Sequence, residues 1–143
     1  GEIKYINYIN SLIKRLELNS DVIFLGHINE AKKSEIMQIS DLFVLPSLNE
    51  NFGIAVVESL QNRLPVVITK DVFIHHPIIK EKAGYLCNRD PNQLSKLIED
   101  IIFEKINKDS NIYLNCFNRN FSRKKCAEEH FKAYLQMIRN YEK

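Results

Sequence analysis

Two glutamates and a glycine in the segment 49–58 combine residue types that can bind a polar ligand. Glu50 and Glu58 flank Gly53, and helix-forming, mostly apolar residues follow the glycine. The apolar run before this segment is typical of a buried strand and stops at Pro46, because proline cannot donate a hydrogen bond to a neighbouring strand. The pattern therefore predicts a strand, a loop and the start of a helix.

The start of this helix is suited to an anion. Asn51 is a candidate N-cap, and the first N–H groups of a helix have no partner within the helix. In a parallel α/β sheet, helix starts and strand ends meet in one crevice, where the helix dipole favours groups such as phosphate. Gly53 would let a ligand approach the backbone, although a glycine can also simply accommodate a helix start. Glu50 alone could equally be a solvated acid beside the helix dipole.

Glu58 adds a second polar group, about 10 Å deeper along the helix axis than Asn51. The helix around it is apolar on most of its circumference, and an unpaired carboxylate there would cost on the order of several kcal/mol. Ligand hydroxyls would supply the missing donors. Glycosidase carboxylates lie about 5 to 9.5 Å apart, and Glu50 and Glu58 are expected near or beyond that limit. Their spacing therefore favours a nucleotide diphosphate sugar over a single glycosidic bond.

The motif Leu45-Pro46-Ser47, Glu50-Asn51-Phe52-Gly53-Ile54 and Glu58 resembles the donor site of retaining GT-B glycosyltransferases of family 4, the glycosyl transferases group 1. The similarity also covers the segments 22–26, 64–69, 83–86 and 90–91. The resemblance implies an α/β fold with a doubly wound, Rossmann-like parallel sheet. Residues 1–143 would then be a partial nucleotide-sugar-binding domain, the GT-B C-terminal domain without its first strands.

The resemblance also assigns the site. It implies that Glu50 and the backbone of Asn51, Phe52 and Gly53 lie near the donor sugar and diphosphate, and that Glu58 binds the ribose hydroxyls. It identifies no catalytic group. It implies no metal ion and no other cofactor, because helix dipoles and basic side chains neutralise the diphosphate in this family and the sequence has no Asp-x-Asp motif.

Gly26 and His27 follow another predicted strand and are further candidates for a nucleotide contact. An exposed loop histidine is the alternative interpretation of His27. His75 and His76 are adjacent in the sequence, which is poor geometry for a shared metal ion.

The implied function is retaining transfer of a sugar from a nucleotide diphosphate donor to a glycan or lipid-linked glycan, as in polysaccharide biosynthesis. In this family an acceptor-binding domain and the first strands of the donor domain, with the basic diphosphate residues, precede the point where Gly1 stands. The chain therefore resembles a piece that is expected to be inactive alone. A nucleotide-sugar epimerase of GT-B fold and a non-catalytic nucleotide-sugar-binding module are the alternatives.

Composition agrees with one globular domain: 143 residues, 45% of them hydrophobic and 27% charged. A net charge of +2 is too small to indicate nucleic acid, and no apolar run is long enough to span a bilayer. Three widely spaced cysteines suggest neither zinc nor disulfides and fit a reducing cytoplasm. The basic run 123–125 is interpreted as a solvated face, with peripheral contact at the inner face of a membrane as the alternative.

Periodicity and capping signals predict alternating helices and strands. The expected helices are 3–18, 30–39 with Ile36 and Ile39 facing inward, 54–60, a short turn at 75–79, a helix from Pro91 capped by Asp90 and Gln93, and 123–141 after Ser122. The expected strands are 22–25, 42–45, 66–69 and one near 85–86. Gln61-Asn62-Arg63 stands where the family has a small residue and a glycine, so Asn62 is expected to help close the motif helix.

The strand order 3-2-1-4-5-6 would leave a gap in this sheet. The strands 22–25 and 42–45 would lie about 14 Å apart with unpaired backbone groups between them. We therefore expect the gap to be filled by chain outside these residues, by pairing with another chain, or by direct pairing of the two strands.

Overall fold

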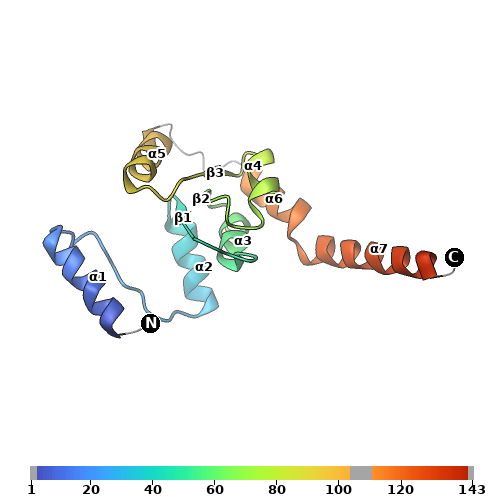
Figure 1. Cartoon of the computed structure of the whole chain (residues 1–143), viewed down its shortest axis with the longest axis horizontal. Helices are drawn as coiled ribbons and strands as arrows, with labels where there is room; N and C mark the ends of the chain where they lie inside the picture. Colours follow the sequence, from blue (N-terminus) through green and yellow to red (C-terminus); the bar gives the residue numbers. More distant parts are fainter. Residues whose placement is uncertain (1–2, 104–110, 142–143) are drawn as a thin grey trace. The chain divides into compact units, whose positions relative to one another are not determined.

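The central sheet has three parallel strands of three residues each, in the order β1-β2-β3 (Figure 1). The strands are β1 (Phe43–Leu45), β2 (Val66–Ile68) and β3 (Gly84–Leu86). β2 lies in the middle and is buried along its whole length, as the unbroken apolar sequence of a central parallel strand predicts. Three of the four expected strands are therefore confirmed.

The computed structural model describes residues 3–103 and 111–141. The chain divides into two units, residues 1–30 and 31–143. The first unit contains α1 (Ile3–Arg15), which ends before the expected Leu18 because Glu17 takes a left-handed conformation with φ of 58°. An extended segment follows this helix.

The expected strand at 22–25 is wrong. These residues form no ladder, and their side chains are exposed, from 38% for Val22 to 79% for Ile23. An apolar segment becomes a strand only when a neighbouring strand pairs with its backbone groups. Residues 22–25 form no such pairing among the described residues. β1 is thus an edge of the described sheet, and pairing of this edge with chain outside these residues or with another chain stays a prediction.

Six helices of the described chain surround or extend from the sheet (Figure 1). They are α2 (Glu30–Ile39), α3 (Ile54–Gln61), α4 (His75–Lys80), α5 (Pro91–Phe103), α6 (Ile112–Asn120) and α7 (Arg123–Tyr141). The sequence analysis missed α6. The other helices match the expected ranges closely, and the bounds of α2 are confirmed.

The two faces of β2 carry two separate apolar cores, which makes the sheet doubly wound. Val66 and Ile68 face a cluster formed with α3, α4 and α6, whereas Val67 packs on the other face with Cys87 and Ile101. Alternate residues of a strand point to opposite faces, so three consecutive apolar residues serve both layers. The expected fold class is confirmed, with α3 and α6 covering one face and α5 the other.

One expectation about a helix face, that of α2, is wrong. Ile39 is 79% exposed, and Met37 takes the buried position of α2 instead. The apolar residues of α7, including Phe131 and Tyr134, are also exposed. In both helices the sequence pattern does not determine which apolar residues are buried, because burial depends on whether another element packs against them. No helix within the described ranges is long and apolar enough to cross a bilayer.

The motif helix α3 ends in a left-handed residue although it has no glycine there. Asn62 is the C-cap, as expected, and its side chain donates to the carbonyl oxygen of Glu58 at 2.9 Å. Arg63 has a φ of 61°. The N–H groups of Arg63 and Leu64 bond to the carbonyl oxygens of Leu60 at 3.1 Å and Ser59 at 2.9 Å, which is the Schellman pattern.

The start of α5 confirms Asp90 as its N-cap. The Asp90 carboxylate accepts a hydrogen bond from the backbone N–H of Gln93 at 2.9 Å. The side chain of Gln93 does not return to Asp90 and instead accepts from Asn88 at 2.7 Å, so the expected capping box is only half formed.

Candidate functional site

The loop that carries Glu50 lies at the carboxyl edge of the sheet, where the sequence placed it. We call residues 46–53 the motif loop. It is fixed to the segment after β2 by three hydrogen bonds: Thr69 Oγ1 donates to Ser47 O at 2.8 Å, Glu50 N to Asp71 O at 3.3 Å, and Phe73 N to Glu50 O at 3.1 Å. Glu50 and Val72 form an isolated parallel bridge. Both backbone groups of Glu50 are therefore held by the rest of the sheet.

Gly53 connects this loop to α3 and needs to be a glycine. Its φ of 71° lies in the left-handed region, which residues with a Cβ rarely adopt. A Cβ there would lie 3.2 Å from Val56 Cγ2 and 3.3 Å from both Glu50 Cγ and Val72 Cγ1. The glycine thus serves both the conformation and the close packing of the loop against the helix.

The carboxylate of Glu50 turns back to the start of α3. Its Oε1 accepts a hydrogen bond from Gly53 N at 3.1 Å. The expectation that Asn51 caps this helix is wrong, because Gly53 occupies the N-cap position and Glu50 provides the nearby acceptor. Asn51 and Phe52 form an exposed bend instead. Residues 50–53 therefore lie at the start of α3, where the Glu50 carboxylate bonds to Gly53 N and no side chain caps the helix.

The first turn of α3 presents backbone donors beside this carboxylate. The first intrahelical hydrogen bonds reach Gly53 O from Val56 N at 2.9 Å and from Val57 N at 3.3 Å. The N–H groups of Ile54 and Ala55 precede these bonds and point beyond the helix start, as in any α-helix. The dipole of α3 adds partial positive charge at the same place. This end of the helix can receive an anion.

Glu58 has a partner that the sequence analysis missed. Lys33 Nζ on α2 lies 2.8 Å from Glu58 Oε1, and the two side chains are only 28% and 23% exposed. The hydrogen-bond donor that a buried carboxylate requires is therefore the ammonium group of Lys33. Nothing in the spacing of the two residues predicts this ion pair, because they are brought together by packing of α2 against α3.

Gly26 and His27 are exposed residues of the first unit. Gly26 has a φ of 63°, and a Cβ there would meet no atom within 4 Å. Their contact with a nucleotide stays a prediction.

The histidines and cysteines of the described chain form no metal centre. No group of three or more metal-ligating residues occurs in the described ranges. His75 Nδ1 lies 2.9 Å from Val72 O, so this ring supports the backbone beside the motif loop. Burial raises the pKa of Cys116 to about 11 with a further contribution from Glu81, and burial also raises the pKa of Cys87. Both are protonated thiols near neutral pH and poor nucleophiles.

A cavity of about 350 Å³ lies at the opposite end of α2 and α3. Its lining includes Met37, Ser40 and Arg63, which precede the strands β1 and β2. Ligands of open α/β sheets bind at the carboxyl ends of the strands, and this cavity is at their amino ends. It is therefore separate from the motif loop.

The model of the family described as glycosyl transferases group 1 matches residues 1–117 of the chain, which include the motif loop and α3. The chain belongs to this family. The resemblance seen in the sequence is confirmed.

Relatives of this glycosyltransferase chain include two proteins of Escherichia coli. The O-antigen biosynthesis glycosyltransferase WclY is 31% identical over 136 residues, which cover 93% of this chain and 36% of WclY. The serotype-specific mannosyltransferase WbdA is 28% identical over 96 residues, which cover 64% of this chain and 12% of WbdA. The chain thus spans about a third or less of the length of these two relatives.

Two solved structures share the fold of the glycosyltransferase chain. Sucrose-phosphate synthase from Thermosynechococcus elongatus superposes with a TM-score of 0.79 at 22% identity, covering 94% of this chain and 34% of that protein. The C-terminal domain of the glycosyl transferase group 1 protein LpcC from Francisella tularensis gives a TM-score of 0.67 at 20% identity, covering 86% of this chain and 64% of that domain. The fold is that of the C-terminal domain of GT-B glycosyltransferases.

Proposed function

We propose that this chain is the donor-binding part of a retaining glycosyltransferase, which moves a sugar from a nucleotide diphosphate to a glycan or lipid-linked glycan. The observation that carries the proposal is the bond from Gly53 N to the Glu50 carboxylate at the start of α3. It puts a fixed carboxylate, which accepts sugar hydroxyls, beside backbone donors that suit a diphosphate. One loop thereby offers groups for both halves of the donor.

The diphosphate would lie at the first turn of α3, against the N–H groups of Ile54 and Ala55. The exposed backbone of Asn51 and Phe52 would line the adjacent part of the donor. Glu50 would accept hydrogen bonds from the sugar. The catalytic group that acts on the anomeric carbon is not assigned.

The ribose hydroxyls would donate to Glu58. Lys33 donates to Oε1 of this carboxylate, and the two oxygens of a carboxylate have further acceptor sites that a ribose could use. Lys33 would hold the carboxylate in a fixed orientation while the ribose binds. A separate nucleotide contact is proposed for Gly26 and His27.

We also propose that no divalent metal takes part in donor binding. The helix dipole of α3 and the N–H groups at its start favour a diphosphate without a metal ion, and basic side chains neutralise the rest of its charge in the family that the chain resembles. Transfer in the presence of excess chelator should therefore proceed at an unchanged rate. A rate that collapses with chelator and returns with Mg²⁺ or Mn²⁺ contradicts this part of the proposal.

The names of the relatives guide the choice of acceptor. O-antigen synthesis by WclY and mannose transfer by WbdA suggest a bacterial polysaccharide as the product. We propose a cytoplasmic enzyme that meets a lipid-linked acceptor at the inner face of the membrane. The three free cysteines, Cys87, Cys116 and Cys126, are compatible with that compartment.

The test uses the full-length protein with a panel of nucleotide diphosphate sugars, with and without glycan acceptors. We expect nucleotide diphosphate release that depends on acceptor, and a product with the same anomeric configuration as the donor. Epimerised donor formed without acceptor would instead identify an epimerase, and donor binding with no turnover under any condition would identify a binding module. Residues 1–143 alone are expected to transfer no sugar, because the acceptor would be bound elsewhere in the protein.

A further inference from the structure

The junction between α6 and α7 touches the motif loop through two aromatic rings. The ring centroids of Phe52 and Phe121 are 6.5 Å apart and the ring planes meet at 89°. This edge-to-face arrangement is a favoured geometry for aromatic pairs. Phe52 directly precedes Gly53 in the motif loop, and Phe121 is the C-cap residue of α6. The two residues are 69 positions apart by their numbers, so the contact joins distant parts of the chain.

Phe121 is the fixed member of this pair. Its N–H bonds to Phe117 O at 2.8 Å, and its carbonyl oxygen lies 3.7 Å from the Sγ of Cys126 on α7. Its ring packs against the apolar cluster beneath α3 and α6. The backbone of Phe121 is therefore fixed by contacts with both α6 and α7, and its side chain is fixed by the apolar cluster.

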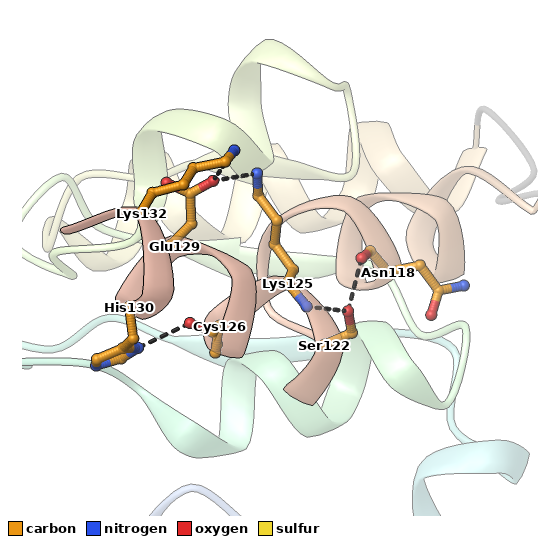
Figure 2. Close-up of polar contacts among 7 residues, drawn as sticks. All are labelled: Asn118, Ser122, Lys125, Cys126, Glu129, His130 and Lys132. Atoms are coloured by element: carbon orange, nitrogen blue, oxygen red, sulfur yellow. Dashed lines mark hydrogen bonds and ion pairs between the residues drawn. The ribbon is translucent and has the colours of Figure 1, made fainter. Parts of the chain in front are cut away.

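Ser122 holds the two helices at this junction. Its hydroxyl donates to Asn118 O at 2.8 Å and accepts from Lys125 N at 3.3 Å, so one side chain bonds to the end of α6 and the start of α7 (Figure 2). Lys125 also pairs with Glu129 at 2.6 Å. These contacts set the direction in which the chain leaves Phe121.

Phe52 is the movable member of the pair. It is 45% exposed and lies in the bend between Glu50 and Gly53. An exposed side chain in a bend can adopt several rotamers, and a contact with a fixed ring reduces their number. Because Gly53 N holds the Glu50 carboxylate, the conformation of Phe52 bears directly on both donor-binding groups.

We propose that Phe121 is a positioning residue for the donor site, acting through Phe52 to hold Glu50 and the start of α3 in the conformation that binds the nucleotide diphosphate. The proposal rests on the proposed function, because it concerns the same ligand. It makes the α6–α7 junction part of the donor site although none of its residues contacts the donor. Phe121 would thus be a determinant of donor affinity that lies outside the sequence motif of Glu50 and Glu58.

The test is a double-mutant cycle in the full-length protein. The variants are Phe121→Leu, Phe52→Leu and the double variant, titrated with whichever of UDP, GDP and ADP binds the wild type most tightly. Each single variant should weaken binding about two- to tenfold, the range expected for an aromatic pair. The double variant should bind no more weakly than the weaker single variant, because one contact is lost in all three. Phe121→Tyr, which keeps the ring, should bind like the wild type.

Phe117→Leu is the matched control, since Phe117 packs against the same cluster from the same helix but makes no ring contact with Phe52. It should lower the melting temperature about as much as Phe121→Leu and leave affinity unchanged. Equal affinity of folded Phe121→Leu and wild type would overturn the inference, as would losses that simply add in the double variant. A wild type that binds no nucleotide diphosphate would contradict the proposed function, whereas a wild type that binds one and variants of equal affinity would contradict this inference alone.

Discussion

Lys33 Nζ lies 2.8 Å from Glu58 Oε1, and this ion pair joins α2 to the helix that carries the motif. Both side chains are more than two-thirds buried. A largely buried carboxylate needs hydrogen-bond donors, so the pair stabilises the packing of α2 against α3 and fixes the orientation of the Glu58 side chain.

Lys33→Met tests the structural part of this relationship. The substitution leaves the largely buried Glu58 without its ammonium partner, so we expect the free energy of unfolding to fall by about 1 kcal/mol, between the values for exposed and fully buried pairs. Urea denaturation gives this quantity. Lys32→Met is the control, because Lys32 pairs with Glu35 on the exposed face of α2 and should change stability by less than about 0.5 kcal/mol. Equal effects of the two variants would contradict the role of Lys33.

Gly53→Ala should disturb both stability and donor binding. The added Cβ meets three side-chain atoms at 3.2 to 3.3 Å, and the φ of 71° is unfavourable for alanine. We expect a loss of about 2 kcal/mol or more in the free energy of unfolding, and weaker nucleotide binding because Glu50 must move. Gly26→Ala is the control: it has a similar φ of 63° but open space around it, so it should cost only about 1 kcal/mol. Similar losses in the two variants would show that packing at Gly53 is unimportant.

Arg63→Gly should stabilise the chain. Arg63 ends α3 with a φ of 61°, which a glycine adopts without the steric cost of a Cβ. We expect the free energy of unfolding to rise by about 1 kcal/mol, measured by urea denaturation. Gln61→Gly, two residues earlier and inside the helix, should instead lower it by about 1 kcal/mol. A destabilised Arg63→Gly would mean that the arginine side chain outweighs the backbone strain.

Cys116 should make stability fall at alkaline pH. Burial and the nearby Glu81 raise its pKa from 9.0 to about 11 in the folded chain. The unfolded chain therefore loses this proton first, and the stabilisation is complete below pH 9 and lost as the pH rises towards 11. Two pKa units correspond to about 3 kcal/mol. In Cys116→Ala, the free energy of unfolding should decline less between pH 9 and 11 than in the wild type; parallel curves for the two proteins would contradict this.

The sequence identified the motif loop because its chemistry is local. Glu50, Gly53 and the start of α3 lie within a few residues of one another, so strand, turn and helix signals in one segment determine their arrangement. The N-cap was assigned to Asn51 because that residue type favours caps. In the structure Gly53 is the N-cap, with a φ of 71° and no side-chain cap, and the Glu50 carboxylate accepts from Gly53 N.

Contacts between distant segments were not predictable in the same way. Lys33 and Glu58 are on different helices, and neither sequence position indicates the other. The segment 22–25 shows a false prediction in place of a missed contact. Its apolar sequence predicted a strand, but these residues form no strand in the structure. A signal for α6 did exist: the apolar residues Tyr113, Cys116 and Phe117 recur at helical spacing and are packed in or against the core.

The most direct test of the account is calorimetric titration of the full-length Glu58→Gln variant with the nucleotide diphosphate that the wild type binds. Glutamine can still accept a hydrogen bond from Lys33, so the free energy of unfolding should change by less than about 1 kcal/mol. A ribose hydroxyl would lose its charged acceptor, and affinity should fall at least about tenfold. Glu35→Gln, an exposed carboxylate on α2, should change neither quantity. A folded Glu58→Gln variant with wild-type affinity would contradict the central claim that this carboxylate binds the nucleotide.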